Sequence, residues 1–218
     1  MKTYNFSLDN KKDLKSIIFD FDETLYYNPL AQESYFNYLK KALLDLTNYN
    51  EDEITNIIKL FGFDLAGERR VSVSQNCSKI GIMQEDWIKY RTEHFYPENF
   101  SHIQTVNNAL MRSLLEKYKL FLVSSEYLDN VHIKASQMNI DLSIFSKIYA
   151  SDGEKLLIIN KQEAYKDILQ SEGLVPSQVI VIGDRYNVDI KPFEEIGGGG
   201  VQITNTDEVE GLIKQLLK

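Results

Sequence analysis

The stretch "SIIFDFDETLYY", residues 16–27, sets two acidic side chains at the end of a short apolar run. Asp20 and Asp22 follow the run directly and stand one residue apart. Aspartate is disfavoured in strands, and neighbouring carboxylates repel each other. Two such residues here predict a functional site at the end of a buried strand. The alternative is a strand end whose acids are merely solvated.

Further apolar runs predict a sheet of buried parallel strands. Unbroken apolar character over about four residues is typical of a strand covered on both faces. The runs are "SIIF" (16–19), "LFLV" (120–123), "VIVI" (179–182) and "VQIT" (201–204), with "KIYA" (147–150) a weaker fifth. Apolar residues at helical spacing lie between or after the later runs, in 103–114 and 209–216. Strands alternating with helices predict an α/β fold with a doubly wound parallel sheet.

The segment after the first strand has a different pattern. Residues 28–100 look helical and carry no clear signal for a parallel strand. Asn28 is a candidate N-cap for a helix that has Pro29 in its first turn. We therefore expect a small α-helical cap domain, 28–100, inserted into an α/β catalytic core made of 1–27 and 101–218.

Two sets of cap residues have alternative interpretations. Trp87, Tyr90, Arg91 and His94 share one helical face, and we expect them to pack inside the cap, with a substrate pocket as the alternative. Arg69 and Arg70 are expected to be solvated charges rather than contacts to an anionic substrate.

Composition excludes several classes of protein. The 218 residues carry a formal net charge of −8, which argues against a nucleic-acid or anionic-membrane partner. The single cysteine, Cys77, cannot form an intramolecular disulfide. The polar start "MKTYNFSLDNKKD" lacks a signal-peptide core, and no apolar run approaches the roughly 20 residues of a membrane span. These features predict a cytoplasmic protein with no membrane partner.

Polar residues end three of the predicted strands. The carboxyl ends of parallel strands meet at one edge of a sheet, where ligands bind. The residues at this edge are Asp20 and Asp22 after the first strand, Ser124 and Ser125 after "LFLV", and Asp184 and Asp189 in "GDRYNVD" (183–189). A carboxylate cluster becomes favourable around a divalent cation, and these hard oxygen ligands suit Mg²⁺ better than a soft metal.

Lys161 breaks a local rule. The run "NKQEAYKDILQSEG" predicts a helix capped by Asn160, with Lys161 in its first turn. A cation there opposes the helix dipole at a cost of about 0.3–1 kcal/mol. Such exceptions are often functional, and a lysine at this place could balance carboxylates and hold an anion. Taken alone, an ordinary surface lysine is the alternative.

The combined pattern resembles the haloacid dehalogenase-like hydrolase superfamily, whose members are mostly phosphatases. "DFDET" (20–24) resembles the first motif of the family, and Ser124 resembles the second. Lys161 resembles the lysine of the third motif, although Gln162 stands where the family usually has proline, so Lys155 is a second candidate. "GDRYNVD" resembles the fourth motif. The resemblance covers 14–27 and 103–218 and implies a Rossmann-like core.

Carried over to these positions, the resemblance implies an aspartyl-phosphate mechanism. Asp20 would be the nucleophile and Asp22 the general acid and base. Mg²⁺ would be held by Asp20, Asp184 and the backbone carbonyl of Asp22, while Ser124 and Lys161 hold phosphoryl oxygens. Supporting roles fall to Asp189, which would orient the lysine or a metal-bound water, and to Thr24 and Ser125.

The implied function is a Mg²⁺-dependent phosphatase acting on a small phosphorylated metabolite. Asp22 argues against a dehalogenase, because a halide leaving group needs no proton. The alternatives are a phosphomutase with the same motifs and a catalytically inactive, phosphate-binding regulatory module. "GGGG" (197–200) is expected to be a helix stop and flexible turn, because a phosphate-binding loop would follow a strand and open a helix.

Overall fold

A computed structural model describes residues 1–60, 77–94, 103–152 and 159–218. These residues form two compact units. The first, the α/β unit, comprises Met1–Tyr27, Ile103–Ser151 and Ile159–Lys218. The second, the helical unit, holds the described residues of 28–94 together with Asp152. No helix in the described ranges is both long and apolar enough to cross a membrane.

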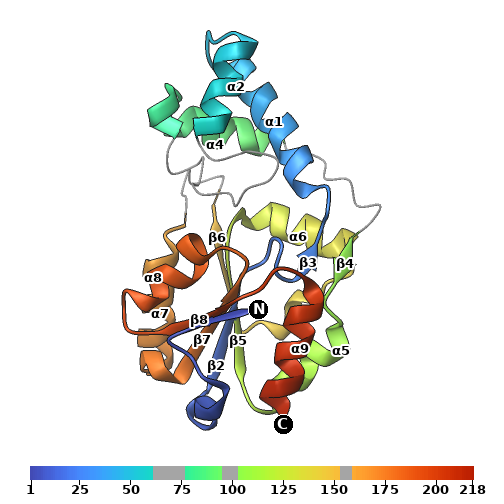
Figure 1. Ribbon diagram of the computed structural model, residues 1–218, viewed down its shortest axis with the longest axis vertical. Coiled ribbons are helices and arrows are strands. Elements are labelled where there is room, and N and C mark those ends of the chain that lie inside the picture. Colours follow the sequence, from blue (N-terminus) through green and yellow to red (C-terminus); the bar gives the residue numbers. More distant parts are fainter. Residues whose placement is uncertain (61–76, 95–102, 153–158) are drawn as a thin grey trace. The chain divides into compact units, whose positions relative to one another are not determined.

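The α/β unit is built on a six-stranded sheet with the order β1-β8-β7-β2-β5-β6 (Figure 1). Its strands are β1 (Lys2–Tyr4), β2 (Ser16–Phe19), β5 (Lys119–Tyr127), β6 (Lys147–Ser151), β7 (Val179–Gly183) and β8 (Gly199–Gln202). All neighbours pair in parallel except β1, which pairs with β8 in the antiparallel direction. A separate two-stranded sheet joins β3 (Tyr26–Tyr27) to β4 (Gln104–Thr105).

Helices cover both faces of the large sheet. Figure 1 shows α7 and α8 on one side of it and α5 and α9 on the other. The helices of this unit are α5 (Asn108–Ser113), α6 (Leu128–Gln137), α7 (Lys161–Glu172), α8 (Lys191–Glu194) and α9 (Thr206–Leu217). Ile18 and Val181 of the sheet belong to one buried cluster with Ile168 of α7 and Phe193 of α8. The predicted α/β, doubly wound architecture is confirmed.

The central strand β2 shows why buried strands appear in the sequence as unbroken apolar runs. Its residues 16–19 are all buried, because β5 and β7 flank the strand and helices lie over the sheet. Phe19, its last residue, pairs with Leu122 of β5 and with Ile182 of β7. All three strands thus run on in register toward the same edge, where the polar residues follow.

Four local features differ from the sequence-based expectations. The first long helix, α1 (Ala31–Leu46), has Leu30 as its N-cap, so Asn28 does not cap it; the Asn28 side chain instead accepts from the Leu30 amide at 3.0 Å. β1 was not predicted, since its sequence "KTY" is polar and largely exposed. The helix expected across 103–114 begins only at Asn108, after β4. The glycine run is not simply a turn: Gly199 and Gly200 belong to β8. A Cβ on Gly200 would lie 2.8 Å from the carbonyl oxygen of Val181, so the close strand contact requires glycine.

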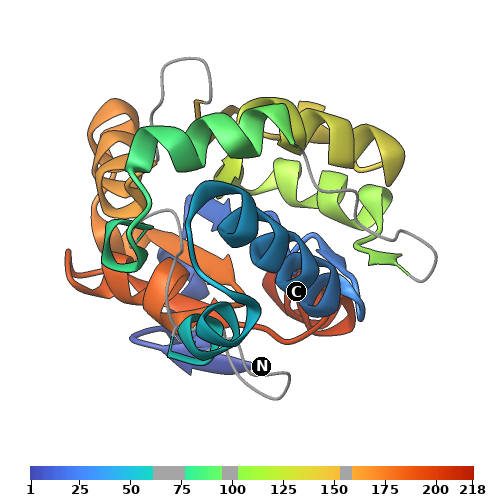
Figure 2. The same cartoon turned by 90° about the horizontal axis from the view of Figure 1, so that it is seen from above.

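The helical unit contains α1 (Ala31–Leu46), α2 (Glu51–Leu60) and α4 (Gln84–Glu93). Helices α1 and α2 lie side by side (Figure 2). One buried cluster joins the three helices through Leu39 and Leu43 of α1, Ile54 and Ile58 of α2, and Trp87 of α4. Trp87, Tyr90 and Arg91 are buried, as expected of packing residues, while His94 is exposed and stacks on Tyr90. Arg69 and Arg70 lie outside the described residues.

Candidate active site

Asp20 is the first residue beyond β2, and the sheet still fixes its backbone. Its amide donates to the carbonyl of Ile182 at 2.9 Å, which continues the pairing with β7 for one more residue. The side chain is buried, and its Oδ1 accepts a hydrogen bond from Nζ of Lys161 at 2.6 Å. The other oxygen, Oδ2, is buried and has no hydrogen-bond partner among the described residues. One oxygen of this carboxylate is therefore anchored and the other is open to a ligand.

Lys161 opens α7 where the sequence predicts the helix to begin. The side chain of Asn160 accepts hydrogen bonds from the amides of Gln162 and Glu163 and so caps the helix. Nζ of Lys161 also donates to Oδ1 of Asp189 at 2.6 Å. Burial lowers the pKa of this lysine, but Asp189 and Asp20 outweigh burial and raise it. The ammonium is therefore held charged between two buried carboxylates.

Asp189 lies on a π-helical turn, Tyr186–Ile190, that follows β7. Its Oδ2 accepts from the Arg185 amide at 2.8 Å, and its backbone carbonyl accepts from the Tyr165 hydroxyl at 3.0 Å. The turn packs tightly against the strand end, since a Cβ on Gly183 would lie 2.5 Å from Cβ of Asp189. Gly183 is thus required for Asp189 to reach Lys161.

Asp184 completes a group of three carboxylates. One oxygen each of Asp20, Asp184 and Asp189 lies within 4.8 Å of the others. Oδ1 of Asp184 is buried and has no hydrogen-bond partner among the described residues; it lies 3.7 Å from Nε of Arg185. The backbone carbonyl of Asp184 accepts from Gln202 on β8 at 2.9 Å.

The electrostatics of this group are unfavourable without a further cation. Burial and the nearby Asp189 raise the pKa of Asp20 to about 6, although Lys161 opposes the shift. Burial also raises the pKa of Asp184, with Arg185 opposing. Two buried oxygens without hydrogen bonds, both on hard carboxylate ligands, fit a divalent cation such as Mg²⁺.

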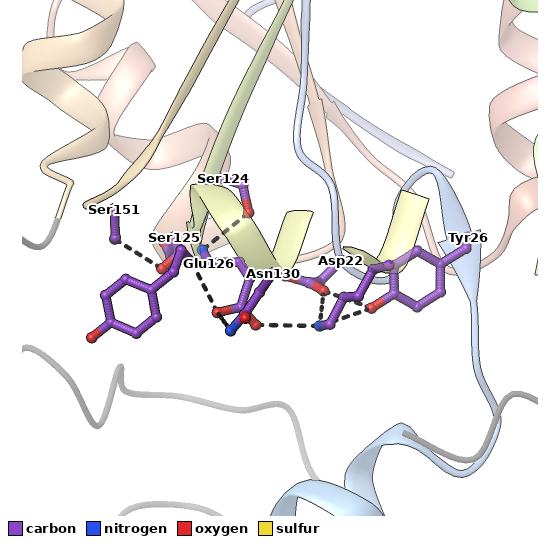
Figure 3. Close-up of polar contacts among 9 residues, drawn as sticks. Asp22, Tyr26, Ser124, Ser125, Glu126, Asn130 and Ser151 are labelled. Carbon is purple, nitrogen blue, oxygen red and sulfur yellow. Dashed lines mark hydrogen bonds and ion pairs between the residues drawn. The ribbon is translucent and has the colours of Figure 1, made fainter. Parts of the chain in front are cut away.

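Asp22 does not join that group. Its Oδ1 accepts from the Tyr26 hydroxyl at 2.6 Å and from Nζ of Lys134 at 2.8 Å (Figure 3). Burial raises the pKa of Asp22, but Lys134 and Tyr26 outweigh burial and lower it to about 2. The chain leaves strand geometry after Phe19, and Glu23 has a left-handed φ of 57°. The carboxylates of Asp20 and Asp22 thus have separate cationic partners, Lys161 and Lys134.

The predicted serines and threonine occupy different environments. Ser124 lies inside β5, is buried, and its Oγ accepts from the Glu126 amide at 3.1 Å. The Ser125 carbonyl accepts from Oγ of Ser151 at 3.0 Å (Figure 3). Thr24 is buried, and its hydroxyl has no hydrogen-bond partner among the described residues. Lys155, the second candidate lysine, lies outside them.

Sequence reasoning missed Lys134, Glu126 and Arg185. Lys134 carried a readable signal, because it falls at helical spacing with Val131 and Met138, two buried apolar residues of the same stretch. A lysine on the apolar face of a helix needs a buried partner. The sequence around Glu126 and Arg185 gives no such indication of burial, since each residue stands among polar neighbours.

Comparisons with known proteins identify the family of this chain and solved structures of similar fold. A family model described as haloacid dehalogenase-like hydrolase matches residues 17–197. A search among curated proteins found no significant match. Among solved structures, a haloacid dehalogenase-like hydrolase from Streptococcus pneumoniae is 18% identical with a TM-score of 0.59, over 92% of this chain and 90% of that one.

Two further structures are similar at comparable levels. A predicted phosphoglycolate phosphatase from Haemophilus somnus is 21% identical with a TM-score of 0.54, over 88% of this chain and 86% of that one. A family enzyme from Bacteroides thetaiotaomicron, solved as a magnesium complex, is 15% identical with a TM-score of 0.50, over 93% and 99%. At these identities the likeness concerns the fold alone.

Proposed function

The chain belongs to the haloacid dehalogenase-like hydrolases, and on that premise we propose that it is a Mg²⁺-dependent phosphatase acting on a small phosphorylated metabolite. The observation that carries the proposal is the buried Asp20 carboxylate, which Lys161 holds by one oxygen beside Asp184 and Asp189. A nucleophile, a fixed cation and a set of hard metal ligands are the parts that phosphoryl transfer needs.

The proposed metal site uses residues of the α/β unit. Asp20, Asp184 and the backbone carbonyl of Asp22 would hold Mg²⁺, and Asp189 would keep Lys161 in place. The ion would offset the negative charge that gathers on the phosphoryl group and its attacker. The magnesium complex of the Bacteroides thetaiotaomicron enzyme supports this choice of metal.

The chain's own residues would then carry out two displacements. In the first, the Asp20 carboxylate attacks phosphorus while the ester P–O bond breaks, and Asp22, whose pKa the negative charge of the bound phosphoryl group would raise, gives a proton to the leaving oxygen. In the second, water attacks the aspartyl-phosphate, Asp22 takes the water's proton, and the Asp20 carboxylate is released. Lys161 and Ser124 would hold the phosphoryl oxygens throughout both steps.

We assign the helical unit the part of a cap for this reaction. Domains that close over a substrate sequester the reaction from water, and the family resemblance implies this part for a helical unit inserted after the first strand. Its described core is made of packed apolar and aromatic side chains around Trp87. A cap of this kind favours a metabolite over a phosphorylated macromolecule as the substrate.

The test is phosphate release from a generic aryl phosphate with and without Mg²⁺. Wild type should be active only with the ion, and Asp20→Asn should lose nearly all activity because the nucleophile is gone. Asp167→Asn is the matched control, since Asp167 is an exposed surface acid paired with Lys147 at 3.0 Å. Equal rates of phosphate release for wild type and Asp20→Asn, or a wild-type rate that does not depend on Mg²⁺, would refute the proposal. A panel of phosphometabolites on the wild type would then identify the substrate.

A further inference from the structure

A buried lysine outside the three-carboxylate group pairs with Asp22. Lys134 lies on α6, and its side chain is fully buried. Its Nζ lies 2.8 Å from Oδ1 of Asp22, 3.2 Å from Oε2 of Glu126 and 3.4 Å from the Tyr26 hydroxyl. The contacts join the loop after β2 to the end of β5 and to α6, which follows β5 directly, although Asp22 and Lys134 are 112 positions apart in the sequence (Figure 3).

The network is anchored at its inner end. Glu126 is buried, and its Oε1 accepts hydrogen bonds from the Tyr127 amide at 2.9 Å and from Nδ2 of Asn130 at 3.2 Å. The other oxygen of Glu126 is thereby fixed in the direction of Lys134. Glu126 holds Lys134, and Lys134 in turn holds Asp22.

Asp22 forms the outer end of the network. Its side chain is 27% exposed, while those of Lys134 and Glu126 are buried. Both hydrogen bonds to its carboxylate, from Tyr26 and Lys134, go to Oδ1. Among the described residues Oδ2 accepts no hydrogen bond, and the partly exposed side chain leaves this oxygen available to a reactant.

A purely structural role explains this arrangement poorly. Burying a lysine and a glutamate carries a desolvation cost that the pair itself barely offsets, and an apolar pair of the same size would pack at least as well. A fixed cation next to a carboxylate that must meet a reacting atom is, in contrast, a common means of holding it in place.

We propose that Lys134, fixed by Glu126 and assisted by Tyr26, is a positioning residue that aims the Asp22 carboxylate at the leaving oxygen. The inference rests on the proposed function, in which Asp22 exchanges protons with the leaving group and with water. The two buried lysines then have separate roles: Lys161 orients the nucleophile Asp20, and Lys134 orients the proton donor Asp22.

The test compares substrates whose leaving groups need a proton to different degrees. A nitrophenyl phosphate leaves readily without protonation, whereas an alkyl phosphate does not, so misaiming Asp22 should harm the alkyl ester selectively. Lys134→Met should lower kcat for the alkyl ester at least tenfold more than kcat for the nitrophenyl ester. Asp22→Asn should show the same selectivity, and the double variant should lose little beyond Asp22→Asn alone.

Two further variants keep the test decisive. Tyr26→Phe removes the other hydrogen bond to the same oxygen without deleting a charge, and it should show a weaker form of the same selectivity even where Lys134→Met does not fold. Lys166→Met, at an exposed lysine of α7, should leave both rates unchanged. Equal losses on both esters in Tyr26→Phe and in any folded Lys134→Met, or losses that add to those of Asp22→Asn, would overturn the inference.

Failure of the proposed function has a different signature. A wild type that releases no phosphate from either ester, and so matches Asp20→Asn, would remove the phosphatase and the positioning role together. A wild type that hydrolyses both esters, with variants that show no selectivity, would remove only the positioning role.

Discussion

Replacing Lys161 by methionine should destabilise the metal-free protein much more than the same change at Lys166. The two lysines belong to α7 and hold carboxylates at nearly the same distance, 2.6 Å to Asp20 for Lys161 and 2.7 Å to Glu163 for Lys166. They differ in burial: the side chain of Lys161 is 4% exposed and that of Lys166 is 48% exposed. The comparison thus contrasts a buried lysine held by two carboxylates with an exposed lysine of the same helix held by one.

The magnitudes follow from what each substitution leaves behind. Lys161→Met leaves the buried carboxylates of Asp20 and Asp189 without a cationic partner. Breaking a buried ion pair in this way lowers the free energy of unfolding by about 3–5 kcal/mol. Lys166→Met leaves Glu163 in water, where the loss is about 0–1 kcal/mol.

Urea unfolding at pH 7 in the presence of a chelator, followed by far-UV circular dichroism, measures both values. We expect the free energy of unfolding of Lys161→Met to lie at least about 2 kcal/mol below that of Lys166→Met. The difference in free energy of unfolding between the two variants should be smaller at pH 5, because the unpaired carboxylates of Asp20 and Asp189 then take up protons. A difference below about 1 kcal/mol at pH 7 would refute the reasoning, since Lys161 would then be no more than a solvated surface charge.

Three further perturbations test other parts of the account. Gly183→Ala should displace Asp189, whose Cβ would lie 2.5 Å from the new methyl group, and lower kcat about 10²-fold; Gly211→Ala, with nothing within 4 Å of the new atom, should leave kcat unchanged. Without metal, the free energy of unfolding of the wild type should fall as pH rises from 5 to 7. The reason is that folded Asp20, with its pKa raised to about 6, still binds a proton that the same carboxyl has released in the unfolded chain. Added Mg²⁺ should offset this loss of stability at pH 7. Asn160→Ala removes the cap of α7 and should cost about 1 kcal/mol in thermal unfolding, with a loss below about 0.3 kcal/mol contradicting the capping role.

The fold was largely readable from the sequence where burial is complete. β2, β5 and β7 are central strands with apolar residues on both faces, so each appears as an unbroken apolar run. β1 lies at the sheet edge with an exposed polar sequence, and such a strand carries no periodic signal. The glycines of β8 resembled a turn because nothing in the local sequence shows that Val181 and Ile190 approach Gly200 so closely.

The candidate site was readable only in part. Asp20, Asp184 and Asp189 could be grouped in advance because parallel strands bring their carboxyl ends to one edge. The partner of Asp22 could not, since it depends on how α6 docks beside the loop that follows β2. The sequence shows Lys134 only as a lysine at an apolar helix position, and its pairing with Asp22 is a tertiary contact across 112 positions of sequence.

A crystal structure with Mg²⁺ and a fluoroberyllate analogue of a phosphoryl group tests the central claim most directly. The account predicts one ion with oxygen ligands from Asp20 and Asp184 at about 2.0–2.1 Å, the analogue attached to the Asp20 carboxylate, and Lys161 in contact with its fluorine atoms. An ion bound away from these two aspartates, or an analogue that does not touch Asp20, would contradict it.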